Sequence, residues 1–206
     1  MWQHEDIAIW MPSSDPPPET IAVDRAVRVY FDGGCPPSTS LGSGGCLVFD
    51  PSGKLLRAAA YFYGRDAPTN NTAEAAAMVD ILRLVESMAW KREYSGVIVM
   101  GDSRLCIAFM QRRAHPGKQA LVAAVQECRE ILKRQQRRHF YFKHVPCELN
   151  ALEDWLAGVA QERQVSLPYV EQLVPWITEG SAPPDSASLD GLVETECAAL
   201  EEQQQQ

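Results

Sequence analysis

The chain has 206 residues, 46% hydrophobic and 22% charged, which excludes a collagen-like or wholly disordered protein. No stretch approaches the roughly 20 uninterrupted apolar residues that cross a bilayer, and Glu5 and Asp6 stand where a signal peptide would be basic. We therefore expect a soluble intracellular protein without a membrane partner, in cytoplasm or nucleus. The six cysteines show no metal-ligand spacing and are interpreted as reduced thiols.

The formal net charge of -8 is unevenly distributed along the chain. Residues 26–163 contain 18 Lys and Arg against 14 Asp and Glu, and this mildly basic stretch is the predicted folded domain. Residues 1–25 include SSDPPPET and are predicted to be a flexible, acidic, proline-rich leader. Residues 164–206 are predicted to be an acidic, partly disordered extension, and nothing in either tail identifies a protein partner.

Three strands open the predicted domain. Residues 26–32 alternate in polarity and are rich in β-branched and aromatic side chains, and residues 44–50 and 54–64 follow around a turn at Asp50-Pro51-Ser52-Gly53. This pattern predicts an antiparallel meander.

Helices dominate the rest of the domain. Residues 70–93 carry apolar side chains at helical spacing, with Asn and Thr capping candidates at their start, and the short apolar run 96–102 is typical of a buried parallel strand. The fold class is therefore α/β, a mixed five-stranded sheet with helices packed on it and a right-handed crossover. Further helices are predicted at 103–113, 118–138 and 150–163, the last capped by Asn150, and a fifth strand at 140–145.

Four acidic residues lie at the ends of these elements. Asp32 ends the first strand and Asp102 ends the fourth, and parallel neighbours bring both to the same edge of the sheet. Glu74 and Asp154 lie in or near the first turns of two helices, from which both side chains can point into the same crevice. Four converging carboxylates repel one another unless divalent cations are present. Such a cluster suits a two-metal site that hydrolyses phosphodiesters.

Several short segments resemble ribonuclease H, type 1. They are FDGG at 31–34, TNNTAE at 69–74, GDSRL at 101–105 and HVPCELNALEDWLA at 144–157, the last similar to the family pattern VPRExNxxADxLA. The resemblance covers nearly all of residues 26–163. It implies a ribonuclease H-like catalytic domain, with three antiparallel and two parallel strands, and a catalytic, metal-binding quartet. The quartet positions here are Asp32, Glu74, Asp102 and Asp154.

The resemblance also implies a mechanism. Two Mg²⁺ ions, replaceable by Mn²⁺, would support in-line attack of water on the RNA strand of an RNA/DNA hybrid, leaving 5′-phosphate and 3′-hydroxyl ends. Asp32 would bridge both ions, Glu74 and Asp102 would complete one site, and Asp154 would hold the second ion. Hard oxygen ligands favour these metals over zinc.

Substrate recognition requires groups that read the shallow minor groove and the 2′-hydroxyls of the RNA strand. Side-chain amides and hydroxyls suit this task, and glycine permits close approach of the backbone to the substrate. Arg104 stands where the family often has glutamine, and it could bind a phosphate. The substrate-binding candidates are Gly33, Gly34, Cys35, Thr69, Asn70, Asn71, Ser103 and Arg104.

The chain departs from the family pattern at three places. Cys147 replaces the arginine of the VPRE segment, and His144 falls at the end of a strand instead of in the loop that often carries a histidine. The basic protrusion of bacterial members has no separate counterpart. Instead, the chain has a basic cluster of Arg129, Lys133, Arg134, Arg137, Arg138 and Lys143. We expect this cluster either to meet DNA phosphates or to form a solvated helix face.

Some alternatives stay open. Glu153 competes with Asp154 as the fourth acid, although the family pattern favours Asp154. The function is expected to be hybrid-specific hydrolysis, but Cys147 and the acidic tails also fit a weakly active or inactive nucleic-acid-binding protein. A nuclease of the same fold with another substrate is a third reading, although the Asp-x-Glu pair of related exonucleases is absent at Asp32.

Overall fold

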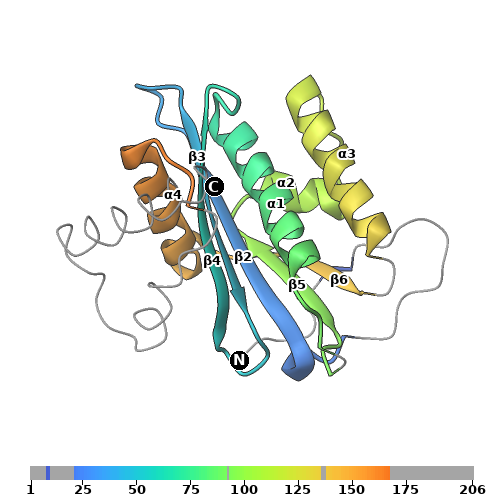
Figure 1. Cartoon of the computed structure of the whole chain (residues 1–206). Helices are drawn as coiled ribbons and strands as arrows, with labels where there is room; N and C mark the ends of the chain where they lie inside the picture. Colours follow the sequence, from blue (N-terminus) through green and yellow to red (C-terminus); the bar gives the residue numbers. More distant parts are fainter. Residues whose placement is uncertain (1–7, 10–20, 92, 136–137, 168–206) are drawn as a thin grey trace, which may run out of the picture.

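A mixed sheet forms the centre of the computed structural model, which describes residues 8–9, 21–91, 93–135 and 138–167 (Figure 1). The strand order is β1-β6-β5-β2-β3-β4. The antiparallel meander and the two parallel strands confirm the predicted five-stranded arrangement, to which the short β1 adds an antiparallel pairing with β6. The strands are β1 (Ala8–Ile9), β2 (Ala26–Gly34), β3 (Gly42–Phe49), β4 (Leu55–Gly64), β5 (Gly96–Gly101) and β6 (Phe140–His144).

Helices cover both faces of this sheet (Figure 1). The cluster that contains α1, α2 and α3 includes the buried side chains of Val27, Val29 and Phe31, whereas α4 packs with Leu47 on the opposite face. The α-helices are α1 (Asn70–Ser87), α2 (Arg104–Met110), α3 (Gln119–Arg134) and α4 (Ala151–Arg163), and short 3-10 helices are η2 (Val23–Arg25) and η3 (Cys147–Leu149).

Alternation along β2 sends its side chains to two different environments. Val27, Val29 and Phe31 are at most 1% exposed and face the cluster that contains α1–α3. Because successive side chains of a strand point to opposite faces, the residues between and after them, Tyr30 and Asp32, face the α4 side. One strand thus supplies core on one face and polar groups on the other.

Two glycines let the helices that carry candidate acids approach the sheet closely. A Cβ at Gly33 would lie 2.3 Å from the backbone carbon of Ala73, at the start of α1. A Cβ at Gly45 would lie 2.1 Å from the carbonyl oxygen of Glu153, at the start of α4. Both separations are far below a normal contact, so only glycine permits this packing.

The first helix is shorter than predicted. It ends at Ser87, and Met88 is already extended, so the expected last turn through residue 93 is wrong. The reason is tertiary, because the rings of Trp90 and Tyr94 meet edge to face at 5.4 Å and the guanidinium of Arg138 lies 4.3 Å above Trp90. This packing redirects the chain into β5. The second helix also stops early, at Met110, before Arg112 with its φ of 59°.

Parts of both predicted tails lie against the described fold. Within the predicted leader, β1 pairs with β6 and Ile21 is 4% exposed. Beyond residue 163, Leu167 exchanges two backbone hydrogen bonds with Ala60 of β4, at 2.9 and 2.7 Å. The remainder of the predicted leader and extension lies outside the described residues. Of the helices in the described part, none is long and apolar enough to cross a membrane.

Candidate active site

Asp32 and Asp102 meet at the edge of the sheet where β2 and β5 end. The parallel register pairs Tyr30 with Met100, so the two acids follow at neighbouring positions. Asp32 is 8% exposed, and its pKa is raised to about 7. Burial is the largest cause of this rise, and the charge of the Asp102 carboxylate, which is within hydrogen-bonding contact, is the next. The backbone N–H of Gly33 opposes this rise. The expected convergence of these two acids is therefore present.

Glu74 reaches the same region from the first turns of α1. Thr69 caps this helix, one residue before the capping candidates that the sequence pattern indicated. Its hydroxyl accepts from the backbone N–H of Thr72 at 3.3 Å, while the Thr72 hydroxyl accepts from the N–H of Thr69. The hydroxyl of Ser103 donates to Oε2 of Glu74. Burial raises the pKa of Glu74 and Asp102 adds to this, whereas the Ser103 hydrogen bond lowers it.

The start of α4 separates the two candidates for the fourth acid. Asp154 is exposed, and its charge is among the causes of the raised pKa of Asp32. Glu153 is 3% exposed and points into the interface between α4 and the sheet, where burial raises its pKa to about 8. Asp154 is thus better placed to meet a solvated ion, and it stays our candidate for the fourth position.

Asn150 does not cap α4 with its side chain, contrary to expectation. Its amide nitrogen donates instead to the carbonyl oxygen of Phe31 at 3.0 Å and to Oδ1 of Asp102 at 3.3 Å. The side chain is 1% exposed and therefore forms a buried link between β2, β5 and α4. The match of Asn150 to the asparagine of the family pattern, four residues before Asp154, was the sequence signal at this position, but it did not indicate this role.

Two further side chains surround Asp102. The exposed thiol of Cys147 forms a hydrogen bond with the Asp102 carboxylate, which raises the pKa of that thiol. Nε2 of His144 lies 3.1 Å from the carbonyl oxygen of Asp102. The sequence did not indicate this proximity, because it arises from the parallel pairing of Gly101 with His144.

The predicted substrate residues divide into structural and accessible groups. Cys35 is 6% exposed and its N–H donates to Oδ1 of Asn70 at 2.8 Å, which ties the end of β2 to α1. Ser103 is 5% exposed and caps α2. Gly33 and the cap Thr69 likewise have packing or capping roles, as described above. Asn70, Asn71 and Arg104 are exposed, and Gly34 is half-buried with open space at its Cβ position.

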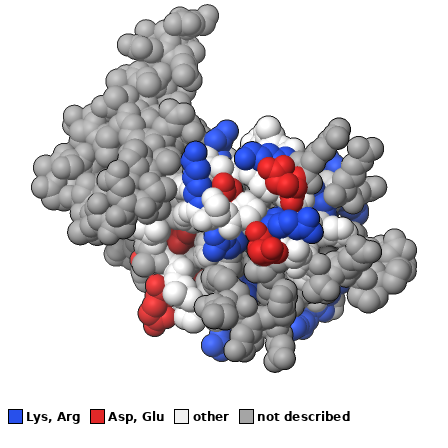
Figure 2. Space-filling view, turned by 90° about the horizontal axis from the view of Figure 1, so that it is seen from below, with Lys and Arg blue, Asp and Glu red and all other residues white. Residues whose placement is uncertain are grey.

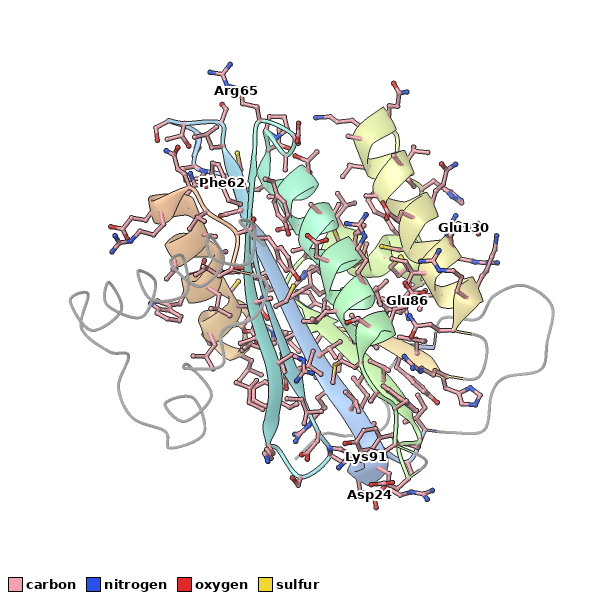
Figure 3. The ribbon with its side chains drawn as sticks, viewed as in Figure 1. Asp24, Phe62, Arg65, Glu86, Lys91 and Glu130 are labelled. Atoms are coloured by element: carbon pink, nitrogen blue, oxygen red, sulfur yellow. The ribbon has the colours of Figure 1, made fainter. Side chains whose placement is uncertain are left out.

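Most members of the predicted basic cluster already have partners. Lys133 pairs with Glu130 at 2.6 Å and Arg134 pairs with Glu86 at 2.8 Å, and both acids are labelled in Figure 3. The end of the molecule seen in Figure 2 likewise mixes Lys and Arg with Asp and Glu. Arg129 donates to a backbone oxygen, Arg138 stacks on Trp90, Lys143 is 9% exposed, and Arg137 lies outside the described residues. The cluster therefore offers less unbalanced positive charge than its sequence indicates.

The donor set matches a hard divalent cation in its chemistry. Carboxylate oxygens are the ligands that Mg²⁺ and Mn²⁺ prefer, and a cation would relieve the repulsion that raises the pKa of Asp32. In the described part of the chain, however, no three His, Cys, Asp or Glu side chains are grouped as a metal site, and Glu74 is bound to Ser103. The residues thus fit the ion in type and location without forming a closed cage.

The sheet order β4-β3-β2-β5-β6, with acids at the ends of β2 and β5, defines a ribonuclease H-like fold. The model of the family described as reverse transcriptase-like matches residues 30–160, and the chain belongs to this family.

Solved structures of ribonucleases H1 resemble the chain. The enzyme of the halophilic archaeon Halobacterium salinarum is 23% identical, with 67% of this chain and 98% of that one covered and a TM-score of 0.59. LC11-RNase H1, isolated from compost, is 26% identical, with 68% and 98% covered and a TM-score of 0.61. LC11-RNase H1 has also been solved in complex with an RNA/DNA hybrid. No curated protein matches the chain.

Proposed function

We propose that the chain is an endoribonuclease that hydrolyses the RNA strand of RNA/DNA hybrids with Mg²⁺, which Mn²⁺ can replace. The observation that carries the proposal is the contact between the carboxylates of Asp32 and Asp102, with Glu74 and Asp154 close by. The structural likeness to LC11-RNase H1, which binds such a hybrid, supports the choice of substrate.

Each acid has a separate role in this proposal. Asp32 would contact two ions, Glu74 and Asp102 would complete one ion site, and Asp154 would hold the second. The bound ions would supply an activated water and stabilisation of the leaving oxygen. The hydrogen bond from Asn150 orients Asp102, and the one from Ser103 holds Glu74.

Accessible polar groups around these acids would receive the substrate. Asn70 and Asn71 lie at the exposed start of α1 and can hydrogen-bond to base edges and 2′-hydroxyls. Arg104 is exposed at the start of α2, where it can bind a phosphate. Two more exposed cations, Arg113 and Lys118, lie in the connection between α2 and α3 and add to the electrostatic attraction.

A second candidate function is hybrid binding without efficient cleavage. One observation favours it: Cys147 replaces the family arginine and bonds to Asp102. A thiol at this position contributes no positive charge toward the phosphates. The two candidates differ in whether a bound hybrid is turned into product.

Cleavage of a labelled RNA/DNA hybrid tests the proposal, with single-stranded RNA, double-stranded RNA and double-stranded DNA as parallel substrates, in Mg²⁺, in Mn²⁺ and in chelator. Metal-dependent cleavage of the hybrid's RNA alone, lost in Asp32→Asn, is the expected result. Hybrid binding without product in either metal would favour the second candidate. Equal cleavage of double-stranded RNA would point to a different substrate.

A further inference from the structure

The chain turns back onto the sheet directly after α4. Gln164 follows the helix in the left-handed conformation, with a φ of 54°, and Leu167 then pairs with Ala60 of β4 in the antiparallel sense. Between them, the hydroxyl of Ser166 accepts from the N–H of Phe62 at 2.9 Å. Because β4 is an edge strand of the sheet, this short segment covers part of an edge that would otherwise be open to other chains.

The antiparallel pairing fixes the direction in which the backbone leaves Leu167. The chain passes Phe62 and then Ala60, so it runs toward Leu55, where β4 begins. Leu167 is 2% exposed and belongs to the same apolar cluster as Leu156 of α4. The backbone at Leu167 therefore points along the outer side of β4, beside α4, toward the turn that precedes β4.

Four half-buried apolar side chains line one side of α4 and the neighbouring end of β3. Those on the helix are three and four residues apart, so they form a stripe along one side of it. By contrast, Leu156 and Ala160, which face the sheet, are at most 1% exposed. We call this stripe the α4 flank, and it consists of Phe49, Leu152, Trp155 and Val159.

The α4 flank lies within reach of the chain that leaves Leu167. Phe49 and Leu152 line one cavity together with Gly53, which belongs to the turn before β4. The five steps from Ala60 back to Leu55 cover about 17 Å of strand. Ten extended residues span up to about 33 Å, so a segment of this length can pass along β4 and reach the α4 flank.

The ten residues that follow Leu167 have the composition of an occupant for such a surface. Residues 168–177 lie outside the described part of the chain, and six of them are large and apolar or aromatic: Tyr169, Val170, Leu173, Val174, Trp176 and Ile177. In residues 178–191, Leu189 is the one large apolar residue. The attachment at Leu167 gives the first segment a far higher effective concentration at the α4 flank than a second copy of the chain has.

We propose that residues 168–177 bind the α4 flank of their own chain, so that the folded domain extends to residue 177 instead of ending at 163. Burial of apolar side chains on both sides drives this contact. It shields the flank from other copies of the chain. Because α4 also carries Asp154, the contact holds the helix on which one of the candidate acids lies. The inference itself does not depend on hydrolysis.

Photo-cross-linking of the full chain tests this contact, with p-benzoylphenylalanine in place of Trp176. The expected product joins residue 176 to α4 or β3 of the same chain, in a yield that does not change with protein concentration. The matched control carries the photoreactive residue in place of Leu189 and should give about ten-fold less of this product. A yield no higher than in the control would overturn the inference, and so would a product between two chains that grows with concentration.

Substitutions on both sides of the contact provide a second test. Val159→Asp on the flank and Leu173→Ser in the segment should each lower the cross-link from residue 176 about five-fold or more, because each weakens an apolar contact. Leu173→Ser should also speed amide hydrogen exchange in α4. Glu162→Gln, at an exposed position of α4, and Leu189→Ser are the matched controls and should change neither readout.

Circular dichroism checks that Val159→Asp is folded. Leu173→Ser alters no residue of the described fold, so it decides the question even if Val159→Asp fails to fold. An unchanged cross-link and unchanged exchange in Leu173→Ser would overturn the inference. Hybrid cleavage by a chain without this contact would leave the proposed function intact.

Discussion

The amide of Asn150 joins the carbonyl oxygen of Phe31 to the carboxylate of Asp102, at 3.0 and 3.3 Å. Through this one buried side chain, the start of α4 is connected to the ends of β2 and β5. The position of Asp154 relative to Asp32 and Asp102 therefore depends on it, since Asp154 lies in the first turn of the same helix and its N–H donates to the Asn150 carbonyl.

Replacing Asn150→Ala should weaken both the fold and the site. Loss of the amide leaves the buried Phe31 carbonyl without this donor, so the free energy of unfolding should fall by about 1–2 kcal/mol. Urea denaturation measures this change. Hybrid cleavage should fall about ten-fold or more, because Asp102 loses its orientation. The control is Leu149→Ala, because Leu149 is the exposed neighbour of Asn150. Its free energy of unfolding should change by no more than about 0.5 kcal/mol. Equal effects of the two substitutions would contradict the role of Asn150.

Asp102→Asn and Asp32→Asn should each abolish hybrid cleavage while keeping the fold. In chelator at pH 8.5, where Asp32 is ionised, Asp32→Asn should also raise the unfolding free energy, by about 2 kcal/mol, because it removes a buried like charge. Asp24→Asn is the matched control, since Asp24 lies at the opposite end of the molecule in Figure 3. Near-normal cleavage in either site variant would refute the assignment of the acids.

The stability of the metal-free chain should fall as the pH rises from about 5.5 to 8.5. The pKa values of Asp32 and Glu153 are raised to about 7 and about 8, so the folded chain holds these protons more tightly than the unfolded chain, in which they leave near pH 4. This contribution to the unfolding free energy is present at low pH. It is lost as the pH rises through the pKa values of the two acids in the folded chain. Urea denaturation in chelator at both pH values measures it.

Mg²⁺ provides the control for this pH dependence. Its addition should restore stability mainly at pH 8.5, where the carboxylates are ionised and can bind it. In Asp32→Asn the loss between the two pH values should be smaller. A metal-free chain that grows more stable over this interval would show that these acids are not protonated as described.

Gly45→Ala should destabilise the chain by about 2 kcal/mol or more and reduce cleavage, because a methyl group there forces α4 away from β3 and carries Asp154 with it. Gly158→Ala lies on the same helix with open space at its Cβ position, and it should stabilise by about 0.5–1 kcal/mol. Thermal unfolding and hybrid cleavage of both variants test this. Similar stability changes in the two would be inconsistent with close packing at Gly45.

Cys147→Arg should strengthen hybrid binding several-fold by adding a cation beside the candidate site, with a steeper dependence on salt. Fluorescence anisotropy at two salt concentrations measures both effects. Cys147→Ser keeps a small hydrogen-bond donor near Asp102 and should leave the salt dependence unchanged. If Arg and Ser behave alike, the family arginine has no phosphate-binding counterpart here.

Local patterns in the sequence were enough to predict much of this protein. Alternation over residues 26–32, the apolar run before Asp102 and the helical spacing of apolar residues after residue 70 led to the correct order of strands and helices, because these signals act between neighbours along the chain. The short resemblance segments likewise pointed to the family that the comparison confirms. The convergence of Asp32 and Asp102 also followed, since parallel neighbouring strands bring their ends together.

Only the tertiary structure decided the rest. The end of α1 at Ser87 depends on Arg138, which lies some fifty positions away and stacks on Trp90, and the link from Asn150 to Asp102 joins equally distant parts of the chain. Glu153 shows the same limit, because its sequence neighbours give no sign that its side chain is buried and lies near the charges of Asp32 and Asp102. Burial and the partners of a charge are set by contacts between remote segments, and these contacts determine pKa and binding.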